Sequence, residues 1–290
     1  MHARNTFVVD PSTTFLLIHG AGTSSSMWGP LQRELAVAGY RSFAVDLPGH
    51  GPGAQFPIAY QAPQDLAALA EEPSTLATTG IDDNVDVVVD AAERLAATGP
   101  VVLVGSSLGG ATLGAAASRA PHLVAGMVYI SAWVCATRVS PIAWMGEPEF
   151  ATSLLPLLGG ISLADPAVIG AGRANYRTGD PEQLALLKEA TMAEATDDEF
   201  RAFLSLMQPD ESLAVMAGDA GVDLAAWGAI PRAFIRLTLD RSIPIELQDR
   251  MIADADRVAP DRPFLTRTLA ASHAGFLRHP VAVSAMLTGY

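Results

Sequence analysis

The chain has 290 residues, half of them hydrophobic and 17% charged, and its 31 acidic and 18 basic residues give a net charge of −13. A chain of this length buries enough apolar surface to fold without disulfides, and the single cysteine, Cys135, excludes an intrachain disulfide or a multi-cysteine metal site. The acidic balance argues against nucleic acid and against an anionic membrane surface as partners. No apolar run reaches the roughly 18 residues of a membrane helix, and the first residues lack the apolar core of a signal peptide. We therefore expect a soluble cytoplasmic protein.

Six short apolar runs are predicted to be strands, and they alternate with helical patterns along the chain. The predicted strands are Thr14–Ile18, Arg41–Asp46, Val101–Val104, Gly126–Ile130, Ala233–Leu239 and Phe264–Leu269, with Thr6–Val9 as an extra edge strand. The predicted helices are Met27–Ala38, Asp82–Thr98, Leu108–Ala120, Pro244–Asp256 and Pro280–Leu287. Nearly continuous apolar strands that alternate with helices predict a doubly wound, mostly parallel α/β sheet.

Two segments interrupt this alternation. Between Val134 and Ala229, about six short helix-like segments separated by prolines follow one another without a convincing strand. Strand-like runs resume afterwards, which favours a helical insertion over a separate C-terminal domain. We therefore expect residues 1–133 and 230–290 to form an α/β core and residues 134–229 to form a helical cap above it. The proline-containing stretch Pro52–Gly80 is predicted to be a surface excursion.

The segment Gly105-Ser106-Ser107-Leu108-Gly109 follows an apolar strand and opens a predicted helix. In a G-x-S-x-G turn of this kind, the central serine occupies a strained strand-to-helix turn, and the residues two before and two after it approach each other closely. Glycine suits both places because a Cβ would clash. This spacing selects Ser107 as the nucleophile, since the residue two before Ser106 is the β-branched Val104.

A serine hydroxyl needs a base that removes its proton, and the chain offers six histidines. His273 is our candidate because it lies in a loop directly after the last predicted strand, and such loops meet at the edge of the sheet that carries Ser107. His279 is the second choice. Of the others, His2 is expected at a frayed terminus, His122 in a surface loop and His19 in a structural role.

The base in turn needs a carboxylate that fixes its tautomer and stabilises its charged form. Asp240 follows the strand Ala233–Leu239 and therefore lies at the same edge of the sheet. The alternative roles for Asp240 are a salt bridge to Arg241 or a cap for the next helix. Asp249 and Asp254 are weaker candidates because they fall inside that predicted helix.

A negatively charged tetrahedral intermediate requires two hydrogen-bond donors. One is predicted to be the backbone N–H of Leu108, the residue after the nucleophile. The other is predicted to be the N–H of Ala21, in the small-residue loop His19-Gly20-Ala21-Gly22 that follows the first strand. No metal or other cofactor is expected to take part.

Taken together, these motifs resemble the α/β-hydrolase superfamily over nearly all of the chain outside the insertion. The landmarks are His19-Gly20-Ala21-Gly22, Asp46-Leu47-Pro48-Gly49-His50-Gly51, the turn at Ser107, Asp240-Arg241-Ser242-Ile243-Pro244 and Ser272-His273. The first and fourth are similar to the small-esterase branch that holds plant methylesterases, hydroxynitrile lyases and bacterial pyrethroid-type carboxylesterases. The resemblance implies an α/β-hydrolase fold with a helical cap inserted after the sixth strand, oxyanion donors at Ala21 and Leu108, and a structural loop around His50.

Two departures from related enzymes narrow the reaction class. Hydroxynitrile lyases carry a lysine directly after the catalytic histidine, whereas this chain has Ala274 there and its one lysine, Lys188, lies in the predicted cap. Haloalkane dehalogenases and related epoxide hydrolases use an aspartate nucleophile, whereas this chain has Ser107. These differences favour hydrolysis of a carboxylic ester or lactone.

The predicted cap is rich in aromatic and flexible apolar residues, which suits a hydrophobic small-molecule substrate. Trp133 and Trp144 are the best candidates for the pocket, because they flank the strand end where the cap departs. The other candidates are Met145, Phe150, Leu154, Leu155, Tyr176, Phe200, Phe203 and Met207. Two alternatives stay open: a non-hydrolytic acyltransferase, cyclase or decarboxylase that uses the same site, and a ligand-binding relative without turnover.

Overall fold

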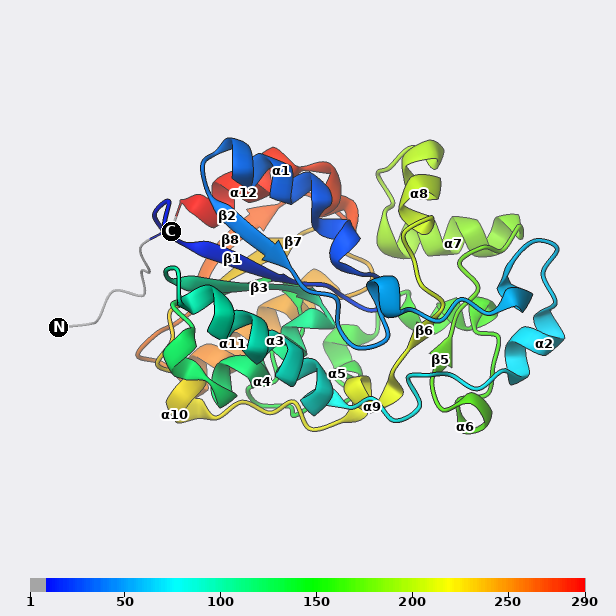
Figure 1. Ribbon diagram of the computed structural model, residues 1–290, viewed down its shortest axis with the longest axis horizontal. Coiled ribbons are helices and arrows are strands. Elements are labelled where there is room, and N and C mark those ends of the chain that lie inside the picture. Colours follow the sequence, from blue (N-terminus) through cyan, green and yellow to red (C-terminus); the bar gives the residue numbers. More distant parts are fainter. Residues whose placement is uncertain (1–8, 290) are drawn as a thin grey trace.

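The computed structural model describes residues 9–289, and a six-stranded parallel sheet runs through its centre (Figure 1). The strands are ordered β2-β1-β3-β4-β7-β8, and every neighbouring pair is parallel. Their bounds are β1 Thr14–Ile18, β2 Arg41–Ala44, β3 Val101–Ser107, β4 Gly126–Ala132, β7 Arg232–Leu237 and β8 Leu265–Leu269. The doubly wound α/β class is confirmed. Of the expected edge strand Thr6–Val9, only Val9 lies inside the described residues, and it belongs to no strand.

Helices cover both faces of the sheet, because alternate side chains of each buried strand point to opposite sides. In β1, Phe15 and Leu17 pack with α1 (Gly29–Val37) and α12 (Pro280–Thr288). Leu16 and Ile18 pack on the opposite face. The helices on that face are α3 (Ile81–Ala96), α4 (Gly109–Arg119) and α11 (Ile245–Val258), which lie below the sheet in Figure 1.

The chain changes its direction of travel across the sheet between β1 and β3. From β1 it passes to β2 on one side of β1, and it then returns to form β3 on the other side of β1. In open α/β sheets, ligands bind outside the carboxyl ends of the strands at such a switch point. A ligand site is therefore expected beside the loop after β1 and the turn after β3.

The segment between β4 and β7, residues 134–229, is called the insertion below. It contains α5 (Pro141–Met145), α6 (Pro166–Ile169), α7 (Pro181–Thr191), α8 (Asp197–Leu204), α9 (Leu213–Ala217) and α10 (Leu224–Trp227). The insertion follows β4, which is the fourth strand of the described chain rather than the sixth. It also holds a short antiparallel pair, β5 (Gly172–Arg173) and β6 (Asp210–Glu211), which corrects the expectation of no strand.

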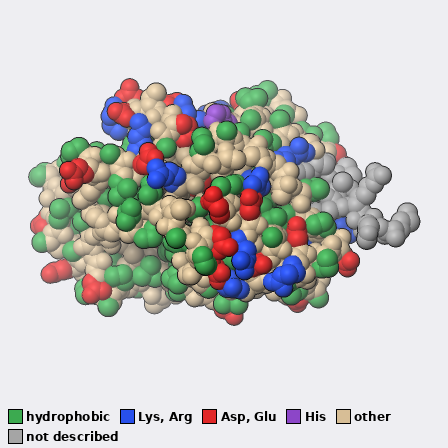
Figure 2. Space-filling view, turned by 180° about the vertical axis from the view of Figure 1, so that it is seen from behind, with side chains coloured by type: hydrophobic (Ala, Val, Ile, Leu, Met, Phe, Trp, Pro, Cys, Tyr) green, Lys and Arg blue, Asp and Glu red, His purple; other side chains and the backbone are tan. Residues whose placement is uncertain are grey.

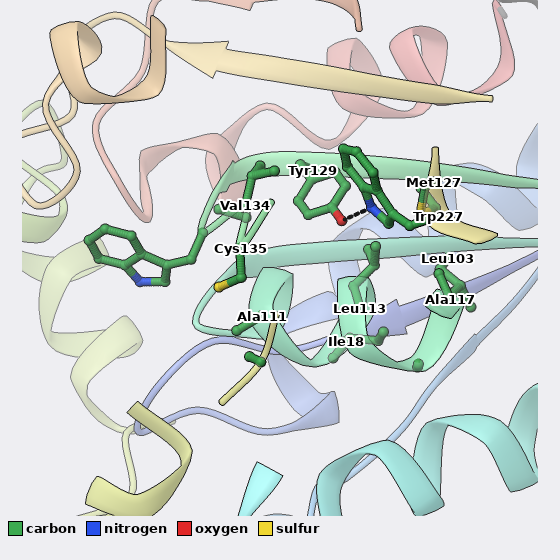
Figure 3. Packing of buried hydrophobic residues seen from close by; sticks show 14 of the residues in the cluster. Ile18, Leu103, Ala111, Leu113, Ala117, Met127, Tyr129, Val134, Cys135 and Trp227 are labelled. Atoms are coloured by element: carbon green, nitrogen blue, oxygen red, sulfur yellow. Dashed lines mark hydrogen bonds between the residues drawn. The ribbon is translucent and has the colours of Figure 1, made fainter. Parts of the chain in front are cut away.

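Both ends of the insertion pack with the core below the sheet. Trp144 of α5 and Trp227 of α10 belong to the same buried cluster as the sheet residues Met127 and Tyr129. Figure 3 shows Trp227 beside Tyr129, whose hydroxyl accepts a hydrogen bond of 3.0 Å from the indole Nε1 of Trp227. The middle of the insertion has a separate cluster of its own, which includes Leu187, Phe200 and Phe203.

The excursion of residues 52–80, which includes α2 (Leu66–Glu71), lies beside the insertion at one end of the molecule (Figure 1). The fully buried guanidinium of Arg173 joins the two segments. It donates to both carboxylate oxygens of Asp210 at 2.6 Å and to the backbone oxygens of Leu69 and Glu72 at 2.7 Å. Ser74 Oγ adds a hydrogen bond of 2.7 Å to the same carboxylate. The excursion and the insertion are thus one packed unit.

The surface carries acidic and basic side chains interspersed on the face seen in Figure 2. None of the helices in residues 9–289 is both long enough and apolar enough to cross a bilayer.

Candidate active site

The turn between β3 and α4 holds Ser107 in a left-handed backbone conformation, with φ of 51°. Such a conformation is strained for a residue that has a Cβ, and it persists only where the surrounding packing enforces it. The packing here is tight: a Cβ on Gly105 would lie 2.9 Å from the backbone oxygen of Gly109, and one on Gly109 would lie 2.5 Å from that of His19. The two glycines therefore allow the sharp turn that presents Ser107 at the end of the strand.

His273 and Asp240 lie together beyond the carboxyl ends of β8 and β7. The Nδ1 atom of His273 is 2.7 Å from Oδ2 of Asp240. An ionised carboxylate only accepts hydrogen bonds, so Nδ1 carries the proton and Nε2 is left as the acceptor. The Asp240 side chain is fully buried, whereas that of His273 is 15% exposed. The pair therefore leaves an unprotonated imidazole nitrogen on the more exposed of the two side chains.

The Asp240 carboxylate receives three further hydrogen bonds. Its Oδ1 accepts the N–H groups of Ser242 and Ile243 at 2.7 and 2.8 Å, and its Oδ2 accepts the Ser131 hydroxyl at 2.5 Å. Asp240 thus orders the turn before α11 in addition to holding His273, but it does not cap that helix, whose N-cap is Pro244 without a side-chain hydrogen bond. The other alternative role, a salt bridge to Arg241, does not occur either, because Arg241 pairs with Glu189 instead.

Ser107 and His273 line one cavity of about 180 Å³, which lies between the sheet edge and the insertion. Within residues 9–289, the Ser107 hydroxyl makes no hydrogen bond to His273. Apolar side chains dominate the wall. They come from Trp133, Met145, Leu155, Leu158, Leu187, Phe203, Leu204, Met207 and Phe276, among others. The two groups therefore share an apolar chamber.

Ala21 and Leu108 line the same cavity. Among the described residues, neither backbone N–H donates a hydrogen bond to another protein group. The loop that carries Ala21 abuts the turn that carries Ser107, since a Cβ on Gly20 would lie 2.9 Å from the Cβ of Ser107. Two unengaged donors therefore lie in the wall of the chamber that contains the serine.

His19 is structural, as expected. Its Nε2 accepts the N–H of Leu47 at 3.1 Å, so Nδ1 bears the proton and donates to the backbone oxygen of Gly20 at 2.9 Å. Burial, together with the neighbouring ring of His50 at 4.8 Å, lowers the pKa of His19 to about 4. The neutral ring thus connects the loop that carries Ala21 to Leu47 in the loop after β2.

His50 has a different environment, because its Nε2 lies 3.4 Å from Oε2 of Glu211 in the insertion. Burial opposes protonation of the ring, but Glu211 outweighs it and raises the pKa of His50. Burial also acts to raise the pKa of Glu211, but His50 and the N–H of Gly22 hold it below its ordinary value. A buried ion pair therefore lies next to the loop that carries Ala21.

Of the two tryptophans expected in the pocket, only Trp133 lines the cavity. Trp144 is a correction: its ring is completely buried in the core cluster, and its Nε1 donates to the backbone oxygen of Val134 at 2.9 Å. Among the other apolar candidates, Phe150, Leu154 and Phe200 do not line the cavity either. A stripe of apolar residues does not reveal which of them face the substrate and which face the core.

Sequence reasoning missed three polar residues around the site. Ser131 binds Asp240, Glu194 accepts the N–H of Ser272 at 2.9 Å, and Glu211 accepts the N–H of Gly22 at 2.9 Å. Their partners lie 78 to 189 residues away along the chain. No local sequence motif predicts such contacts.

Of the other histidines considered from sequence, His279 precedes α12 and His122 lies in a short turn after α4, while His2 falls outside the described residues.

The fold and the site define a doubly wound α/β protein in which a strained serine lies at the switch point and a histidine–aspartate pair lies beyond the carboxyl ends of two other strands of the sheet. The chain belongs to the alpha/beta hydrolase family, whose model matches residues 15–286. The resemblance stated from sequence motifs is confirmed.

Curated relatives include a pyrethroid hydrolase of Sphingobium wenxiniae. It is 27% identical over 270 residues, which are 92% of this chain and 84% of that protein. The putative chloroplastic methylesterase 13 of Arabidopsis thaliana is 24% identical over 273 residues, which are 94% of this chain and 55% of that protein. Both belong to the kinds of esterase that the sequence motifs resemble.

Solved structures give the same result. A pyrethroid hydrolase from Sphingobium faniae JZ-2 superposes with a TM-score of 0.72 at 25% identity, and the match covers 96% of each chain. Polyneuridine aldehyde esterase superposes with a TM-score of 0.67 at 20% identity, over 96% of this chain and 98% of that one. The second likeness concerns the fold alone.

Proposed function

We propose that this protein is a serine hydrolase that cleaves a carboxylic ester or lactone of a hydrophobic small molecule through an acyl-enzyme on Ser107. The observation that carries the proposal is the hydrogen bond of 2.7 Å between His273 and a buried Asp240, in the wall of an apolar cavity that also contains Ser107. The names of the relatives, a pyrethroid hydrolase and a methylesterase, support ester cleavage as the reaction class.

In the proposed mechanism, Nε2 of His273 takes the hydroxyl proton while Ser107 Oγ attacks the carbonyl carbon. The N–H groups of Ala21 and Leu108 bind the oxyanion, and His273 then returns the proton to the leaving alcohol. Water, deprotonated by the same imidazole, attacks the acyl-enzyme and releases the acid and the free serine. Each step uses only groups that line the cavity.

The apolar wall suits an uncharged substrate with a hydrophobic acyl or alcohol part. In this proposal the middle of the insertion serves as a cap, because Leu158, Leu187 and Phe203 come from it and line the cavity that also contains Ser107. We keep the cytoplasm as the proposed compartment, which cell fractionation tests.

The test combines turnover with covalent trapping. Wild-type protein should hydrolyse p-nitrophenyl butyrate, and in H₂¹⁸O it should place the label in the acid, which an acyl transfer to another acceptor would not do. A p-nitrophenyl alkylphosphonate should leave a single adduct on Ser107, detected by peptide mass spectrometry. Ser107→Ala should abolish turnover and adduct with an unchanged circular dichroism spectrum, whereas Ser106→Ala should still form the adduct. Normal turnover by Ser107→Ala would end the proposal.

A further inference from the structure

The loop that carries Ala21 is held from two sides. On the sheet side, His19 and Thr23 bind the backbone oxygen of Gly20 at 2.9 and 2.7 Å. On the other side, the insertion binds both polar backbone groups of Gly22. Its oxygen accepts the N–H of Gln208 at 2.7 Å, and its N–H donates to Glu211 Oε2 at 2.9 Å.

The contact between this loop and the insertion is close as well as polar. Gly22 has a φ of +62°, and a Cβ at this position would lie 3.0 Å from the Tyr176 hydroxyl and 3.1 Å from Cε of Met207. Both of those side chains line the cavity, whereas Glu211 does not. Glu211 therefore binds the Gly22 N–H from outside the cavity and is not placed to touch a substrate.

The side chain of Glu211 is only 15% exposed, and its neighbours stabilise a charged carboxylate there. His50, whose side chain is 4% exposed, contacts Oε2, while Oε1 accepts the N–H of Ser212 at 3.0 Å. A buried carboxylate is costly unless it is paired and hydrogen-bonded. Here part of its compensation is the amide hydrogen of the residue directly after Ala21.

We propose that Glu211 is a positioning residue for the oxyanion site: by accepting the Gly22 N–H it fixes the peptide that follows Ala21 and so holds the Ala21 N–H toward the Ser107 side of the cavity. The inference rests on the proposed function, because it assigns Ala21 a role in the reaction. A donor that is fixed in advance stabilises developing charge without reorganisation, so loosening it lowers the rate of the chemical step more than substrate binding.

Three variants separate this role from general support of the fold. Removal of a whole oxyanion donor costs about 10²–10³ in kcat, so Glu211→Ala, which only loosens one, is expected to lower kcat about 10- to 100-fold with KM within about threefold. Glu211→Gln keeps an oxygen that can accept the Gly22 N–H and should retain kcat within about threefold of wild type. Ser212→Ala is the matched control.

Ser212 is the buried neighbour of Glu211, and its hydroxyl caps α9 and donates to the Thr79 backbone oxygen at 2.6 Å. Loss of such a cap should lower Tm by about 2–4 °C while leaving kcat unchanged. A low kcat in Ser212→Ala equal to that of Glu211→Ala would overturn the inference, because destabilisation of this segment would then explain both. Equal damage in Glu211→Gln and Glu211→Ala would overturn it as well.

Affinity for an alkyl trifluoromethyl ketone gives an independent readout, because the hemiketal oxygen that it forms on a serine occupies the oxyanion position. Its inhibition constant should rise in Glu211→Ala by the factor by which kcat falls, and should be unchanged in Ser212→Ala. If Ser107→Ala retains turnover or the ketone does not inhibit wild type, the proposed function fails and this inference falls with it. If both of those controls behave as expected and Glu211→Ala matches wild type, only the positioning role is refuted.

Discussion

Ser131 donates a hydrogen bond of 2.5 Å to Oδ2 of Asp240, the same oxygen that faces the imidazole of His273. Ser131 lies near the carboxyl end of β4 with a φ of 39°. A strained backbone conformation therefore holds its hydroxyl in this position. With two backbone N–H groups on Oδ1, the carboxylate is fully hydrogen-bonded within a buried site. Its orientation is therefore fixed by the sheet and by its own turn, and it does not depend on His273.

Replacement of Asp240 by asparagine should lower kcat about 10³- to 10⁴-fold, because an amide that donates to Nδ1 leaves the imidazole in the wrong tautomer to accept the serine proton. The measurement is kcat for p-nitrophenyl butyrate at pH 7.5. Asp249→Asn is the control: that carboxylate pairs with Arg236 on the surface, so its loss should change kcat less than twofold. Similar activity of the two variants would show that Asp240 has no part in the reaction.

The substitution Gly109→Ala should reduce the free energy of unfolding by about 3 kcal/mol, because the new Cβ would meet backbone atoms that cannot move aside. Those atoms are the oxygens of His19 and Ile18, at 2.5 and 2.7 Å. Gly53→Ala, where the new methyl group meets nothing within 4 Å, should change it by less than about 0.5 kcal/mol. Urea unfolding followed by tryptophan fluorescence tests both, and equal stabilities would contradict the tight turn.

The two tryptophans at the base of the insertion should respond differently to substitution. Trp133 lines the cavity, so Trp133→Leu should change the ratio of kcat/KM between p-nitrophenyl octanoate and butyrate about tenfold in favour of the longer chain. Trp144 does not line the cavity, so Trp144→Phe should leave this ratio within twofold. It should instead reduce the free energy of unfolding by about 1–3 kcal/mol, because the buried oxygen of Val134 loses its donor. A change of the ratio in Trp144→Phe alone would reverse the assignment.

The buried neutral ring of His19 should make stability depend on pH. Burial and the His50 ring lower its pKa from 6.5 to about 4, so between these values the unfolded chain binds the proton more readily. The stabilisation is complete above pH 6.5 and is lost as the pH falls toward 4, by up to about 3 kcal/mol. Urea unfolding of wild type and His19→Asn at pH 7.5 and pH 5 measures the difference, and parallel changes in the two proteins would refute it.

The sequence predicted the sheet well because each buried strand is a nearly continuous apolar run. Ser107 could be selected as the candidate because Gly105 and Gly109 flank it at the spacing of a G-x-S-x-G turn that follows an apolar strand. Asp240 and His273 followed from their places just after predicted strands, since parallel strands bring such residues to one edge. Boundaries were less certain: β3 runs three residues beyond Val104, and the helix expected from Met27 begins as a 3₁₀ turn, Ser25–Trp28.

What the sequence could not predict are contacts between segments that are far apart in the chain. Glu211 and Gly22 are separated by 189 residues and Ser131 and Asp240 by 109, and neither pair forms a spacing that a motif could capture. The β5–β6 pair was missed because a strand of two residues has no periodicity to detect. Trp144 was misplaced because composition does not show which side of a short helix faces the core.

The ionic clamp between Arg173 and Asp210 has a mechanical consequence. Because Arg173 also binds the carbonyl groups of Leu69 and Glu72, the insertion that helps to line the chamber is tied to the excursion of residues 52–80. Any movement of the insertion away from the core must therefore either carry the excursion with it or break these hydrogen bonds. If the insertion moved alone, Arg173 would keep Asp210 but would lose both carbonyl acceptors, so we expect the two segments to move together.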